Sequence, residues 1–142
     1  GVSTYGWIWE TGAGGGGGAT ATAKMSLQAT TGNLQIAGSF TAGGNVTAFS
    51  DKRLKENIQT LDGKKALQMR GVSFIKDGEE GSGVIAQEVE KIAPELVMTA
   101  DDDMGTKSVA YGNLVGYLIE TVKDQQKQID ELKQRLDNDS SD

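Results

Sequence analysis

Short alternations of apolar and polar residues fill the chain between residues 23 and 48, as they do in β-strands. Glycine and asparagine interrupt them at intervals, which predicts three or four short strands of an all-β array. Strands this short do not bury a core alone, but three chains wound together could share one. The pattern therefore predicts an intertwined trimeric β-stem. Its apolar positions are Met25, Leu27, Leu34, Ile36, Phe40 and Val46.

The first 22 residues contain two tryptophans and a run of five glycines. Trp7 and Trp9 lie two residues apart, so in a strand both would face the same side. A run of glycines holds no helix and weakens a strand. Residues 1–22 therefore have two interpretations, a flexible linker and a backbone packed tightly around a symmetry axis.

Helical and strand-like periods mix between residues 51 and 110. Residues 51–62 are polar, with apolar points at Leu54, Ile58 and Leu61, which fits a short helix or a turn followed by a strand. The rest is typical of a small α+β unit, whose core would be marginal alone. The expected elements are a short helix at 66–69, strands at 72–75 and 83–86 around an acidic turn at 76–81, a helix at 87–92 that ends before Pro94, and strands at 96–98 and 109–110.

From about Tyr111 onward, apolar residues follow a seven-residue repeat. Six of its seven seam positions are apolar and charged residues flank them, which is typical of a coiled coil. A single amphipathic helix packed on the domain would show a similar pattern over so short a run. The polar seam position, Gln125, would fix register or oligomer number at some cost in stability. The seam consists of Val115, Leu118, Val122, Gln125, Ile129, Leu132 and Leu136.

Charge divides the chain near residue 50. Residues 1–50 carry only Glu10 and Lys24, whereas the rest carries 13 of the 14 bases and 19 of the 20 acids, a net charge of −6. This balance argues against nucleic acid as a partner, because phosphates require a basic face. No run of the sequence is long and apolar enough to span a membrane. We therefore expect neither nucleic acid nor a membrane among the partners.

The sequence contains no histidine and no cysteine. Catalysis by Ser-His-Asp or Cys-His groups is therefore excluded within this chain, and a zinc site is not expected. The composition suggests no cofactor and no metal. Any nucleophile would have to be a hydroxyl activated by a different base.

Ser50 is the hydroxyl for which the sequence offers such a base. Lys55 follows five residues later, and Lys52 and Arg53 lie between them. A lysine loses its proton where it is desolvated or lies near other cations, so this crowding favours the neutral amine that catalysis needs. The spacing alone is weak evidence, because Ser50 or Asp51 could simply cap a helix.

Three motifs that occur in order along the chain favour a catalytic Ser50 over a simple helix cap. They are SDKRLKENI, GVIAQEVEKIAPELV and SVAYGNLVGYLIETVKDQQKQIDELKQRL. Together they resemble the C-terminal intramolecular chaperone domain of phage tailspikes and tail fibres, the endosialidase-type autopeptidase family, over residues 50–136. The family's S-D-x-R-x-K pattern is met by Ser50, Asp51, Arg53 and Lys55.

The resemblance implies a serine autopeptidase that cuts its own chain once. Ser50 would be the nucleophile and Lys55 its general base, in a Ser-Lys dyad. The expected scissile bond is Ser50–Asp51, and an N-to-O acyl shift at Phe49–Ser50 is the alternative. Whether Lys55 acts within its own chain or on another copy is left open.

Three further residues would support this site. Asp51 and Arg53 would shape the turn. Glu88, in the second motif, would pair with Lys55 or Arg53. The ordinary explanation of Glu88 is a solvated position on a helix face.

The expected architecture is α+β: an intertwined trimeric β-stem, a small α+β domain and a long C-terminal helix forming a trimeric coiled coil.

The expected function is a self-cleaving chaperone whose partners are two further copies and, as folding client, the upstream fibre chain. The alternative is a structural trimerisation module that stays attached. The self-cleaving chaperone would assemble in the host cytoplasm, leave its stem in the virion tail fibre and be released. The expected segments are stem 1–49, chaperone 50–110, coiled-coil helix 111–138 and frayed tail 139–142.

Overall fold

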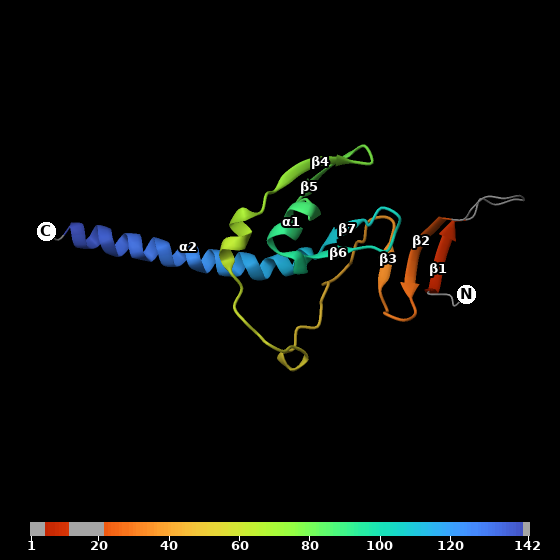
Figure 1. The fold of residues 1–142 in the computed structure, drawn as a ribbon, viewed down its shortest axis with the longest axis horizontal. Coiled ribbons are helices and arrows are strands. Elements are labelled where there is room, and N and C mark those ends of the chain that lie inside the picture. Colours follow the sequence, from red (N-terminus) through yellow and green to blue (C-terminus); the bar gives the residue numbers. More distant parts are fainter. Residues whose placement is uncertain (1–4, 12–21, 141–142) are drawn as a thin grey trace, which may run out of the picture. The chain divides into compact units, whose positions relative to one another are not determined.

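The computed structural model describes residues 5–11 and 22–140, with side chains from residue 25 onward (Figure 1). The chain divides into two compact units, one ending at Leu54 and the other beginning at Lys55. The first contains one sheet, and the second contains two short hairpins and a long C-terminal helix. The predicted α+β class, with small sheets and a long C-terminal helix, is confirmed.

An antiparallel sheet in the order β1-β2-β3 forms the first unit. Its strands are β1 (Tyr5–Thr11), β2 (Thr22–Gln28) and β3 (Leu34–Ile36). Apolar positions of β2 and β3 pair across the sheet, Met25 with Ile36 and Leu27 with Leu34. Gly32, with φ at +71°, lies in the connection, where its N–H donates to the Gln28 carbonyl at 2.8 Å.

The linker interpretation of residues 1–22 is wrong for residues 5–11, because that segment pairs with β2 as a strand. Trp7 and Trp9 lie in this strand, but their side chains, like residues 12–21, fall outside the described part of the chain. The register shifts on either side of these two residues, so the pairing is irregular there.

The predicted strands around Phe40 and Val46 do not form. Both residues lie in an irregular, exposed segment, with 65% of Phe40 and 76% of Val46 accessible to solvent. In a strand each would share its face only with a glycine and an alanine, so neither has a large apolar neighbour with which to build a strand. The 3-10 helix η1 (Lys52–Leu54) follows, which agrees with the short-helix interpretation of residues 51–62 and not with a strand there.

The second unit surrounds a small core of Val89, Ala93, Leu96 and Tyr117. Figure 1 shows the long helix α2 beginning next to the β6–β7 hairpin and running away from both hairpins of this unit. The elements are η2 (Gly63–Gln68), β4 (Val72–Lys76), β5 (Glu79–Gly83), α1 (Ala86–Ile92), η3 (Pro94–Leu96), β6 (Val97–Thr99), β7 (Lys107–Val109) and α2 (Tyr111–Asp139).

The first hairpin of this unit corrects the predicted position of its second strand. The strand was expected at residues 83–86, but β5 ends at Gly83. Asp77 and Gly78, with φ of +55° and +86°, form a two-residue turn that pairs Lys76 directly with Glu79. Asp-Gly favours this turn because both positions need positive φ, so the strand starts earlier than the hydrophobic pattern indicates.

Helix α2 presents different residues to the unit and to solvent. Tyr117 and Thr121 are buried, at 3% and 6% exposure, and Leu114 packs against the core beside them. The apolar seam positions lie about 100° further round the helix and remain between 46% and 66% exposed. They are Val115, Leu118, Val122, Ile129, Leu132 and Leu136.

Candidate active site at Ser50

The chain between residues 50 and 55 makes one short turn. The Asp51 carboxylate accepts a hydrogen bond from the Arg53 backbone N–H at 2.8 Å, and the Leu54 N–H donates to the Asp51 carbonyl at 3.1 Å. These two bonds close η1, with Ser50 two residues before its first residue and Lys55 directly after its last. Asp51 is thus the side chain that caps this turn.

Asp51 and Arg53 also form a bidentate ion pair. Arg53 Nη2 lies 2.6 Å from Asp51 Oδ2, and Arg53 Nε lies 3.0 Å from Oδ1. The guanidinium hydrogen bonds hold the pKa of Asp51 below its usual range, and the carboxylate raises the pKa of Arg53. The pair fixes the conformation of the turn and leaves Asp51 charged.

Solvent reaches the whole of this segment. Every residue from 49 to 62 is exposed, and 98% of Phe49 is accessible. Ser50 belongs to the first unit, and Lys55 is the first residue of the second. The catalytic pairing of Ser50 with Lys55 stays a prediction.

The partner that the structure shows for Glu88 is Arg70. Arg70 Nη2 lies 2.5 Å from Glu88 Oε1 and Arg70 Nε lies 3.2 Å from Oε2, joining α1 to the connection between η2 and β4. This hydrogen bonding holds the pKa of Glu88 below its usual value. The predicted pairing of Glu88 with Lys55 or Arg53 therefore has a competitor that the sequence did not suggest.

Two further long-range pairs are not predicted by the sequence pattern. Lys107 Nζ lies 2.7 Å from Glu90 Oε1, and the Tyr117 hydroxyl donates to Glu95. These partners are 17 and 22 residues apart, on different elements. Periodicity assigns such residues to helices or strands but does not identify their partners.

Within residues 5–11 and 22–140, no group of three or more histidine, cysteine, aspartate or glutamate residues is placed to hold a metal ion. The helices in the same part of the chain are all too short or too polar to cross a bilayer.

Comparison with known proteins gives two matches. Residues 50–98 match the model of a peptidase family described as chaperone of endosialidase. The long tail fiber protein Gp37 of Salmonella phage S16 is 33% identical over 125 residues, which cover 75% of this chain and 16% of that protein. The chain thus spans well under two thirds of this relative. The family resemblance is confirmed for residues 50–98, which contain the first two of the three motifs.

Proposed function

We propose that this chain forms a homotrimer, helps a phage tail fibre to fold, and then cuts itself at Ser50. The proposal starts from the match of residues 50–98 to the chaperone-of-endosialidase family. The folding client would be the β-rich chain that ends in the first unit. The similarity to a phage long tail fiber protein supports a fibre as that client.

The exposed seam of α2 is the observation that carries the proposal. The unit packs its own core through Tyr117 and Thr121, and this leaves the heptad positions uncovered. A continuous apolar stripe on a long helix is typical of a surface that another helix covers. If α2 were only a helix packed on its own domain, the seam residues would be the buried ones.

Association also supplies what the chemistry needs. A lysine acts as a base most readily where solvent is excluded, and Ser50 and Lys55 are exposed in the single chain. Further copies around the turn would exclude this solvent. We propose that cleavage is therefore restricted to assembled chains.

The proposed step is attack of Ser50 Oγ on a backbone carbonyl carbon. Lys55 Nζ takes the hydroxyl proton and returns it to the departing amide nitrogen, leaving an ester that water hydrolyses. Within one chain Oγ reaches the Phe49 carbonyl through a five-membered ring. Its own carbonyl would require a four-membered ring, so cleavage at Ser50–Asp51 needs a hydroxyl from another copy.

Refolding followed by denaturing electrophoresis tests the function. The wild type should give fragments of roughly 5 and roughly 10 kDa from the 15.0 kDa chain, and Ser50→Ala should remain whole. Lys55→Ala and Lys55→Arg should both lose cleavage, because arginine keeps the positive charge but does not act as a base. Intact masses of the fragments identify which bond is cut.

A second function is favoured by the geometry of the turn itself. The hydrogen bonds of Asp51 are those of an ordinary capped turn, which needs no catalytic role for Ser50. The chain would then be a structural trimerisation module that remains on the fibre. A wild type that trimerises and stays whole after refolding establishes this alternative and excludes the dyad.

The two alternatives place the mature parts differently. In the self-cleaving scheme, assembly takes place in the host cytoplasm, the stem enters the virion tail fibre, and the segment from about residue 50 onward is released. In the attached-module scheme, that segment stays in the virion. Mass spectrometry of purified particles for peptides of α2 distinguishes them.

A further inference from the structure

The segment that carries Lys55 joins the long helix at Gly63. From residue 49 to residue 62 every residue is exposed, and Gly63 is the first buried residue that follows. The Gly63 carbonyl accepts a hydrogen bond from the Thr121 hydroxyl of α2 at 2.6 Å. This bond is buried, and it defines where the segment joins the folded unit.

The backbones meet closely at this point. A Cβ atom at Gly63 would lie 2.5 Å from the Thr121 backbone nitrogen and 2.6 Å from the Glu120 carbonyl carbon. Such distances are far inside van der Waals contact, so only glycine allows the approach. Asp62 caps the helix that starts here by accepting from the Lys64 N–H at 3.0 Å.

A neighbouring contact repeats the pattern one turn earlier on α2. A Cβ atom at Gly116 would lie 3.0 Å from Leu61 Cδ1, so the leucine side chain packs over a helix position without a side chain. Leu61 and Gly63 thus dock on the stretch of α2 between Gly116 and Thr121. The first three seam residues, Val115, Leu118 and Val122, belong to the same turns.

From this geometry we propose that Gly63 and Thr121 position the segment bearing Lys55, and so link pairing of the α2 seam to self-cleavage. The proposal rests on the function proposed above. When the seams pair, these helix turns become fixed, and the Gly63 anchor then limits where the eight residues from Lys55 to Asp62 can reach. Thr121 is a positioning residue in this scheme and touches no reacting atom.

Removal of the Thr121 hydroxyl tests the proposal. Thr121→Val keeps the shape and the β-branch, Thr121→Ser keeps the hydroxyl, and Thr60→Val makes the same exchange at an exposed position of the segment. The full chains are refolded, trimer is quantified by sedimentation, and fragments are followed over time. We expect Thr121→Val to cleave on the order of fivefold more slowly per trimer formed, and the other two variants to cleave at the wild-type rate.

Each other outcome contradicts the proposal. A wild-type rate per trimer in Thr121→Val excludes a positioning role, even if that variant forms less trimer. An equal loss in Thr121→Ser shows that packing of the methyl group matters and the hydrogen bond does not. A wild-type chain that trimerises without cleavage contradicts the proposed function itself, whatever the Thr121 variants do.

Discussion

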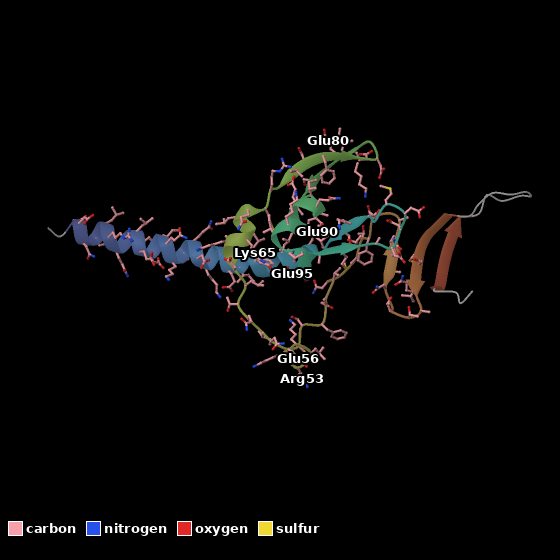
Figure 2. All side chains as sticks on the ribbon, viewed as in Figure 1. Arg53, Glu56, Lys65, Glu80, Glu90 and Glu95 are labelled. Carbon is pink, nitrogen blue, oxygen red and sulfur yellow. The ribbon has the colours of Figure 1, made fainter. Side chains whose placement is uncertain are left out.

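Tyr117 connects α2 to the rest of its unit through three interactions. Its ring lies in the core at 3% exposure, its hydroxyl donates to Glu95, and the Lys65 ammonium lies 5.9 Å from the ring centroid. Figure 2 shows Lys65 and Glu95 next to α2. The hydrogen bond from Tyr117 holds the pKa of Glu95 below its usual range. Burial, together with the Glu95 carboxylate, raises the pKa of Tyr117 to about 12.

We predict that Tyr117→Phe lowers the free energy of unfolding by about 1 kcal/mol near neutral pH, because the ring stays and the hydrogen bond is lost. The contribution of Glu95 is present above its unfolded-state pKa and is lost as pH falls through the lowered folded-state pKa. The contribution of Tyr117 is present below the unfolded-state pKa of about 10 and is lost as pH rises toward 12.

Urea unfolding of the wild type and the variant checks this prediction. The difference between the two proteins should be largest near neutral pH and should shrink on both the acid and the alkaline side. Tyr111→Phe is the matched control, because the exposed Tyr111 hydroxyl only accepts from the Val84 N–H at 3.3 Å. A difference for Tyr117→Phe that does not change with pH would show that the pair with Glu95 contributes nothing.

The sequence predicted single residues where the signal was local. The capped turn at residues 51–54 followed from an Asp near bases, since a short polar side chain reaches its own backbone. The ion pair of Glu88 with Arg70 did not follow, because a whole hairpin separates the two residues in the chain. Their approach depends on how α1 and η2 pack, which no local pattern encodes.

Among the elements, α2 gives the sharpest prediction. Leu132 lies on the seam and is 56% exposed in the single chain, so Leu132→Glu should leave the fold of the unit unchanged. In an assembled coiled coil the same change places a charge at an apolar seam position and loses about 2 kcal/mol of burial per chain. We expect a shift from trimer toward monomer.

Sedimentation equilibrium measures this shift. Gln134→Glu adds the same charge two residues away at a position outside the seam, and it should remain trimeric. Circular dichroism of both variants reports whether the unit remains folded. Equal sedimentation of the wild type and Leu132→Glu would show that the seam is not an interface.

Element type was more predictable than element position. The helix at the C-terminus followed from a repeat sustained over three heptads, and the pair β6 and β7 appeared close to its expected place. The strand β5 was misplaced because the backbone preference of Asp77-Gly78 overrides the hydrophobic pattern. Strands at Phe40 and Val46 failed because strand formation needs cross-strand partners, and the sequence does not show where these lie.

At the scale of the molecule, the two units have different folding requirements. In the first unit, β1 pairs with β2 across ten intervening residues and β2 with β3 across five, whereas α2 forms from contacts about four residues apart. Local structure forms faster than non-local pairing. A helix that trimerises early would raise the effective concentration of the attached β-rich segments and favour their pairing in register.

If α2 trimerises before the chain cuts itself, the rate of self-cleavage depends on protein concentration. If the site is complete only in an assembly, tenfold dilution during refolding should slow the appearance of fragments about tenfold, in the range where association limits the rate. Quantitative electrophoresis over a dilution series measures this dependence. A half-time independent of concentration would mean that one chain cuts itself unaided, and assembly would then not be required.

The core of the second unit has a practical consequence. Every residue that forms it or packs against it lies between Ala66 and Tyr117, well inside the stretch that begins at Lys55. Among the side chains that the structure describes, none before Ala66 contributes to this hydrophobic interior. The unit is in that sense portable, and could be transplanted behind an unrelated fibrous protein as a detachable folding aid.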